Sequence, residues 1–170
     1  MGACYRYIRY LAYMIEIIVF YVLEQIPNTL PNINGVKPLI LILIGIMIAL
    51  FEGEKVGTVF GLIVGLFLDC GSTGTIGFYS IIMACAGFLV GVIAQRMIKI
   101  NLVTALLVST PFIFVVYIMH FLVNYLFCGY KDVLYAMCSH YLIGILYTFL
   151  LSPFIYFFNK AFAVNIKREE

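Results

Sequence analysis

Few side chains in this 170-residue sequence could do chemistry inside an apolar environment, and Glu16 is the most unusual of them. Isoleucines flank Glu16 on both sides, and an ionised carboxylate at membrane depth costs about 2.5 to 3.5 kcal/mol on insertion scales. We therefore expect Glu16 to face the interior of a helix bundle, where it is protonated or paired. No Lys or Arg lies deep in an apolar stretch, so the polar candidates are His120, Asn124 and His140. With one of them Glu16 could form a proton relay or, as we favour, an interhelical hydrogen bond.

Other catalytic and metal-binding patterns are missing from the sequence. There is no G-x-S-x-G, HExxH or Walker motif, and no carboxylate pair is spaced for acid–base chemistry. The two histidines and five cysteines form no cluster at zinc-ligand spacing, so we predict no metal and no cofactor. A disulfide between Cys70 and Cys128 stays open, although free thiols are the default. An intramembrane enzyme is the weakest of the three functional hypotheses considered.

A second acidic residue, Asp69, continues a row of glycines that are spaced four residues apart: Gly53, Gly57, Gly61 and Gly65. On an α-helix this spacing drifts by only about 40° per step and forms one slowly winding stripe. In a membrane, rows of small residues let a second helix backbone approach closely. The stripe predicts a packing groove for another helix, either of the same chain or of a partner protein.

A glycine-rich turn follows Asp69 and includes Gly74 and Gly77. Asp69 could cap this turn by accepting backbone N–H bonds, which is the usual chemistry of aspartate beside glycine. It could instead contact a partner at the membrane surface. A second small-residue pair, Gly87 and Gly91, is expected to have a structural role.

Composition places the chain among integral membrane proteins of the all-α class. It is 65% hydrophobic and 11% charged, with a mean hydropathy of +1.12. The net charge of +2 and the lack of a basic run with interleaved aromatics argue against nucleic-acid binding. We predict a single transmembrane domain, residues 1–170, with six spans that begin with an uncleaved N-terminal helix. The spans are expected at about residues 7–26, 36–51, 54–69, 76–95, 102–127 and 133–158.

The basic residues predict the orientation of these six spans. Of the ten Lys and Arg residues, only Lys37 and Lys131 fall on one side of the layout, and the other eight fall on the opposite side. The positive-inside rule therefore predicts that both termini are cytoplasmic and that Asp69 lies at the outer end of the third span.

The stretch from Glu52 to Gly77 resembles the rod shape-determining protein MreD family. It contains the core V-G-T-V-F-G-x3-G-L-F-L-D, followed by a glycine turn that closes with T-I-G. The positions that match the family pattern are Gly57, Gly61, Gly65, Asp69, Gly74 and Gly77. The resemblance implies a non-enzymatic, multi-pass scaffold of the cell-elongation complex in the bacterial cytoplasmic membrane. It further implies binding to MreC and support of peptidoglycan synthesis, with wall enzymes (a penicillin-binding transpeptidase and a glycosyltransferase) and MreB filaments as further partners.

The family resemblance also suggests an alternative function. The same compact six-helix bundle is thought to be similar to the substrate-binding subunits of energy-coupling-factor vitamin transporters. Such a subunit needs a pocket near the outer side of the bundle, with convergent polar groups that orient the vitamin. The loops offer few such groups, and the first span lacks a small-residue row for docking on an energising partner. We therefore favour the scaffold.

Overall fold

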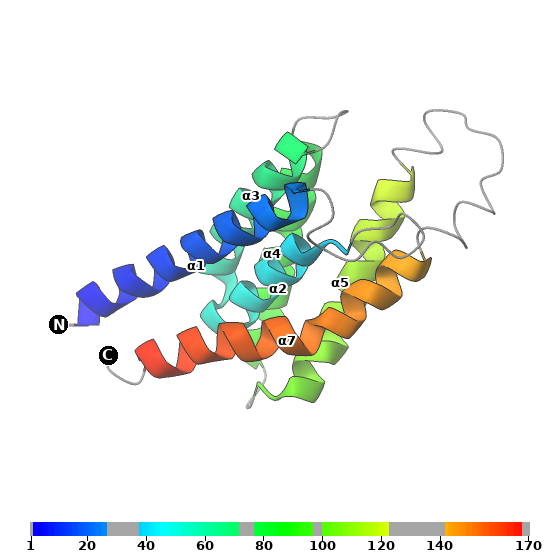
Figure 1. Ribbon diagram of the computed structural model, residues 1–170. Coiled ribbons are helices and arrows are strands. Elements are labelled where there is room, and N and C mark those ends of the chain that lie inside the picture. The colour runs from blue at the N-terminus through cyan, green and yellow to red at the C-terminus, as the bar shows by residue number, and fades with distance from the viewer. Residues whose placement is uncertain (1, 27–37, 72–76, 97–99, 123–141, 168–170) are drawn as a thin grey trace, which may run out of the picture.

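A computed structural model describes residues 2–26, 38–71, 77–96, 100–122 and 142–167. Within these ranges the chain forms six helices and no strand, so the prediction of an all-helical chain is confirmed (Figure 1). The helices are α1 (Gly2–Gln25), α2 (Ile40–Glu52), α3 (Glu54–Gly71), α4 (Phe78–Arg96), α5 (Leu102–Phe121) and α7 (Leu142–Lys167).

Helix α2 lies at the centre of the bundle and contacts α1, α3, α4, α5 and α7 (Figure 1). Its sequence from Ile40 to Leu50 has no polar side chain, and every residue in it is buried, with at most 4% of any apolar side chain exposed. A helix that is apolar on all sides is stable only where neighbours cover it on all sides. The other helices therefore pack around α2, with Tyr13 and Ile17 of α1 and Phe60 and Val64 of α3 in the same buried core.

Three of the described helices are long and apolar enough to cross a membrane, which is fewer than the six spans expected. They are α4 over Phe78–Arg96, α5 over Leu102–Met119 and α7 over Leu142–Ala163, whereas α2 is a shorter apolar helix. Helices α1 and α3 do not qualify, because each carries three charged residues within the length of a span. Three of these charged groups, Arg9, Glu16 and Asp69, are buried inside the bundle.

Helix α7 extends beyond the expected end of the sixth span, and the bounds of that span stay a prediction. The sixth span was expected to end at residue 158, but α7 continues to Lys167. Asn159, the residue that follows the expected span, is fully buried in the structure. Lys160 is exposed, and its Nζ lies 5.6 Å from the centroid of the Tyr156 ring, within the range of a cation–π contact.

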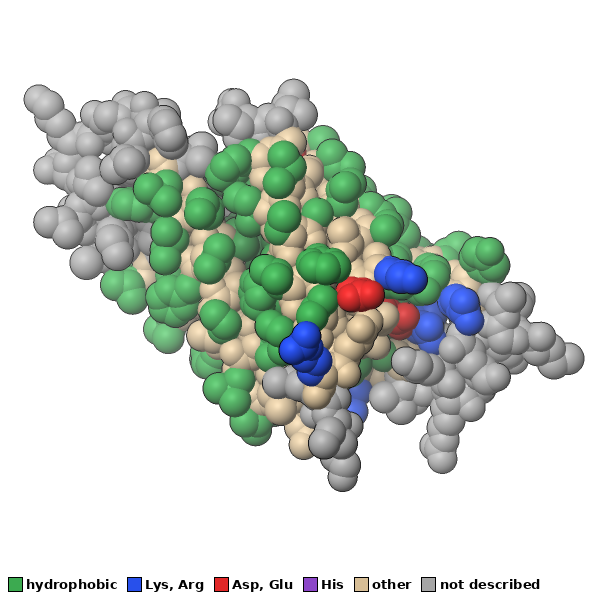
Figure 2. All heavy atoms as spheres, turned by 180° about the vertical axis from the view of Figure 1, so that it is seen from behind, with side chains coloured by type: hydrophobic (Ala, Val, Ile, Leu, Met, Phe, Trp, Pro, Cys, Tyr) green, Lys and Arg blue, Asp and Glu red, His purple; other side chains and the backbone are tan. Residues whose placement is uncertain are grey.

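The surface of the molecule is mostly apolar. Figure 2 shows hydrophobic side chains over most of one face, with the Lys, Arg, Asp and Glu side chains gathered toward one end. Exposed basic residues lie at the start of α1 and α3 and toward the end of α4 and α7: Arg6, Lys55, Arg96 and Lys160. The start of α1 and the end of α7 lie near each other at the left of Figure 1.

Candidate functional site

A buried ion pair joins α1 to α2. The Nε atom of Arg9 lies 2.7 Å from Oε1 of Glu52, and a second guanidinium nitrogen of Arg9 donates to Oε2 at 3.1 Å. The Tyr13 hydroxyl donates to Oε1 of Glu52 at 3.1 Å. The Arg9 and Glu52 side chains are each 4% exposed, so the pair is desolvated. Loss of either side chain would leave the other as an uncompensated buried charge. The sequence reading treated Arg9 as a marker of topology and did not predict this pair.

A second buried polar contact joins α1 to α7. Glu16 is 4% exposed, and its Oε1 accepts a hydrogen bond of 2.8 Å from Nδ2 of Asn159, which is 0% exposed. The expectation that Glu16 faces the bundle interior agrees with this position. Its partner among the described side chains is Asn159, which the sequence reading had placed just beyond the end of the sixth span. The signal that could have revealed it is the position of Asn159 four residues after the buried Ile155, on the same face of the helix.

The three partners predicted for Glu16 lie outside what the structure describes. Asn124 and His140 fall outside the described ranges, and His120 lies in α5 with an undescribed side chain. Their relation to Glu16 therefore stays a prediction.

The glycine stripe of α3 lies against α4 and α2 of the same chain. A Cβ atom added at Gly61 would come closer than 3.0 Å to the carbonyl oxygen of Met83, and one at Gly65 would meet the backbone of Ser80 equally closely. At Gly57 it would meet both Ala49 of α2 and the carbonyl oxygen of Gly87. These three glycines are buried, so they do not form an open groove for a partner.

The glycines of α4 complete this contact. A Cβ atom at Gly87 would come closer than 3.0 Å to the carbonyl oxygen of Gly57, and one at Gly91 would meet the backbone of Glu54. Helices α3 and α4 therefore pack backbone to backbone along most of their length, because glycines face the contact from both sides. The structural role expected for Gly87 and Gly91 agrees with this arrangement.

Asp69, at the end of α3, accepts hydrogen bonds from the beginning of α4. Its Oδ2 accepts from the backbone N–H of Gly77 at 3.0 Å and of Ser80 at 3.1 Å, and from the Ser80 hydroxyl at 2.5 Å. Its Oδ1 accepts from the backbone N–H of Tyr79 at 2.9 Å. A carboxylate at a helix N-terminus satisfies N–H groups that have no partner within the helix and interacts favourably with the helix dipole. Of the two roles considered for Asp69, the geometry supports the cap.

Two further glycines of the predicted set lie just before the beginnings of α3 and α4. Gly53 joins α2 to α3 with φ of +87°, and Gly77 precedes α4 with φ of +94°, a conformation that favours glycine at both positions. A side chain at Gly53 would also meet the amide of Gln95, whereas the space around Gly77 is open. Gly74 lies outside the described residues.

Comparison with known proteins identifies the family. Residues 5–164 match the family model for rod shape-determining protein MreD. The chain belongs to the MreD family. The match covers nearly the whole chain, far beyond the 26 residues from Glu52 to Gly77 that carried the resemblance in the sequence. No curated protein and no solved structure matches the chain. Membership of the MreD family supports a role in rod shape determination, and the three apolar helices support a membrane protein.

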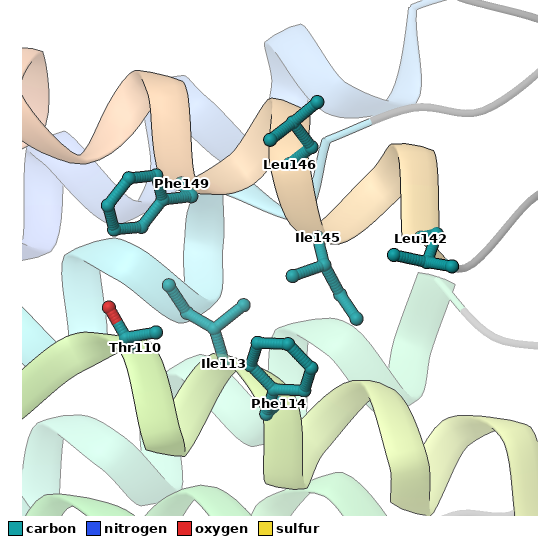
Figure 3. A pocket seen from close by; sticks show the side chains of 7 residues that line it. All are labelled: Thr110, Ile113, Phe114, Leu142, Ile145, Leu146 and Phe149. Carbon is teal, nitrogen blue, oxygen red and sulfur yellow. The ribbon is translucent and has the colours of Figure 1, made fainter.

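This MreD-family protein has an apolar groove between α5 and α7, with a volume of about 250 Å³ (Figure 3). Its lining is formed by Thr110, Ile113 and Phe114 of α5 and by Leu142, Ile145, Leu146 and Phe149 of α7. The one hydroxyl in the lining, on Thr110, donates to the carbonyl oxygen of Leu106 at 2.6 Å. The groove can therefore accept hydrocarbon, and its described lining residues offer no free hydroxyl to orient a polar ligand.

The described polar groups of this MreD-family protein mainly hold helices together. In the described ranges no three His, Cys, Asp or Glu side chains are grouped closely enough to hold a metal ion. Cys70 and Cys85 are free and exposed, and Cys128 lies outside the described residues.

Proposed function

We propose that this MreD-family protein is a non-catalytic, multi-pass scaffold of the cell-elongation complex in the bacterial cytoplasmic membrane. It binds MreC and supports peptidoglycan synthesis and cell-shape control, with wall synthases and MreB filaments as further partners. The observation that carries this proposal is the family match over residues 5–164.

The packing of the bundle supports a scaffold. Its buried polar side chains connect α1 to α2, α1 to α7 and α3 to α4. Such contacts give a bundle a defined shape, and a defined shape is what a scaffold contributes to an assembly. The exposed apolar surface provides contact area for the membrane segments of other proteins.

The distribution of charge supports the proposed orientation. The exposed basic residues of α1, α3, α4 and α7 lie at helix ends that the positive-inside rule assigns to the cytoplasm. The charged side chains visible in Figure 2 gather at one end of the molecule. Both termini are therefore placed in the cytoplasm in our proposal.

In the part of the chain that the structure describes, the lining of the groove between α5 and α7 fits a vitamin poorly. A vitamin pocket combines an apolar wall with a few polar groups that fix the orientation of the ligand. The lining of this groove presents apolar atoms, and its single hydroxyl is already bonded within α5. The groove suits an apolar side chain or a lipid tail better than a polar solute.

The covered glycine stripe changes how a partner interface should be tested. A leucine at Gly65 would strike the backbone of Ser80 and disturb the α3–α4 contact, so loss of a partner in that variant would say nothing about an interface. Exposed apolar positions are better probes. Leu11 of α1, Phe88 of α4 and Leu146 of α7 are 61%, 47% and 68% exposed and lie on different helices.

Site-specific photo-crosslinking in cells tests the proposal. A photoreactive residue is placed at Leu11, Phe88 or Leu146, and at fully buried Met47 as a matched negative control, after folding of each variant is checked. We expect ultraviolet-dependent capture of MreC from at least one exposed position and no capture from Met47. Lack of MreC at all three exposed positions, or capture of a transport ATPase module instead, would contradict the scaffold.

A further inference from the structure

We propose that Glu16 holds a bound proton in the folded protein, so that Glu16 and Asn159 form a proton-binding acid–amide pair between α1 and α7. The proposal is independent of the partner that the scaffold binds. It rests on the orientation of the Asn159 amide, on two oxygens that lack a donor, and on the charges around Glu16.

The orientation of the Asn159 amide is determined by two acceptors. Its Nδ2 donates to Oε1 of Glu16 at 2.8 Å and to the carbonyl oxygen of Ile155 at 3.2 Å. If the amide were turned over, its oxygen would face both of these acceptor oxygens, and an amide oxygen cannot donate. The nitrogen of Asn159 therefore faces Glu16 and the backbone, and its Oδ1 points elsewhere.

Two acceptor oxygens of this pair have no donor among the described residues. They are Oε2 of Glu16 and Oδ1 of Asn159, and both residues are at least 96% buried. Buried polar atoms in proteins nearly always have a hydrogen-bond partner. An ionised Glu16 would leave both oxygens as acceptors. A proton on Oε2 removes the buried negative charge and leaves Oε1 as the acceptor of the Asn159 amide.

The charges near Glu16 do not neutralise a carboxylate. On α1, Tyr13 lies nearly one turn before Glu16, and its hydroxyl donates a hydrogen bond to Glu52 of α2. Glu52 is itself negative and is paired with Arg9, so the cation of this region is already bound by another carboxylate. On α7 the nearest cation in sequence, Lys160, is exposed and packs on the ring of Tyr156.

Where α3 packs against α1, the two helices contact each other through aromatic rings. Phe60 of α3 packs against the rings of Tyr10 and Tyr13, and Phe67 packs against Tyr21. Within the described residues, the only ion pair at this face of α1 is that of Arg9 with Glu52, and none includes Glu16. A proton is therefore the cation that fits the carboxyl group of Glu16.

Infrared spectroscopy of the full chain in lipid vesicles, with isotopically labelled glutamate, tests the proposal. A protonated carboxyl group has a carbonyl stretch that an ionised carboxylate lacks. At neutral pH we expect one such glutamic-acid band that is lost in Glu16→Gln and kept in Glu24→Gln, a matched variant on the same helix. Absence of the band in the wild type, or its persistence in Glu16→Gln, would overturn the proposal.

A pH titration of the wild type keeps the proposal testable if Glu16→Gln does not fold. We expect the glutamic-acid band to persist at neutral pH and to disappear reversibly at alkaline pH. Because the unfolded chain releases this proton at about pH 4.3, the melting temperature of the wild type should fall as the pH rises from about 4.3 toward the pH at which the band disappears. Where Glu16→Gln folds, its melting temperature should fall less over the same range. Equal loss of melting temperature in both proteins would show that another group titrates and would overturn the proposal.

Discussion

Replacing Gly61 by alanine should loosen the α3–α4 contact, whereas the same change at Gly45 should be tolerated. Both glycines are buried in helices. A Cβ at Gly61 would lie closer than 3.0 Å to the carbonyl oxygen of Met83, which is backbone. A Cβ at Gly45 would lie 3.0 Å from the terminal methyl of the Met83 side chain, which can rotate away.

The magnitude follows from the distance that the helices must separate. Ordinary Cβ contacts begin near 3.4 Å, so α3 and α4 must move apart by at least 0.4 Å at Gly61. Overpacking of this kind costs about 1 to 3 kcal/mol. The gain in helix propensity from glycine to alanine, about 1 kcal/mol, offsets part of that cost at both positions. We therefore expect Gly61→Ala to be less stable than Gly45→Ala by about 1 to 3 kcal/mol, since only the clash differs.

Unfolding in detergent, followed by far-ultraviolet circular dichroism as sodium dodecyl sulfate is added, measures this difference. The double variant Gly61→Ala/Gly65→Ala adds a further check, because both changes require the same separation of the same two helices. Its loss of stability should be smaller than the sum of the two single losses. Equal stability of Gly61→Ala and Gly45→Ala, or strict additivity in the double variant, would refute the backbone contact.

Three other contacts lead to further predictions, each measured by the same unfolding assay. Asp69→Ala should destabilise the protein by about 2 kcal/mol because α4 loses its cap, and Asp69→Asn by less because one oxygen can still accept; equal losses would point to the charge rather than the hydrogen bonds. Glu52→Gln should cost about 3 kcal/mol because Arg9 is left as a buried charge, and adding Arg9→Met should restore part of that loss, which a simple packing defect would not allow. Gly53→Ala should cost about 1 to 2 kcal/mol because φ of +87° disfavours a Cβ atom, and a neutral result would show that this turn can change conformation.

The helical class and the closely packed stripe could be predicted from sequence, because both depend on local patterns. A run of apolar residues is enough to indicate a membrane helix, and glycines four residues apart share one face of it. The spacing of the glycines does not identify the helix that packs against them. That α4 does so depends on Gly87 and Gly91 facing Gly57 and Glu54, which is visible only in three dimensions.

The polar contacts of the bundle were harder to predict. Arg9 and Glu52 lie 43 residues apart, and Glu16 and Asn159 lie 143 apart, so no local pattern links the members of either pair. Hydropathy also treats a polar residue as the end of a span, and the sixth span was accordingly expected to end at about residue 158, one residue before Asn159. A polar side chain inside a bundle is stabilised by its partner, and the partner is absent from the local sequence.

The enclosure of α2 has a consequence for how the protein adapts to bilayers of different thickness. At 1.5 Å per residue its 13 residues span about 20 Å, less than the roughly 30 Å of a hydrocarbon core. Because the surrounding helices cover α2, lipid tails do not contact it, and its length carries no energetic penalty for hydrophobic mismatch. Adjustment to a thicker or thinner membrane can therefore occur in the tilt and length of the peripheral helices, while the central helix keeps the same neighbours.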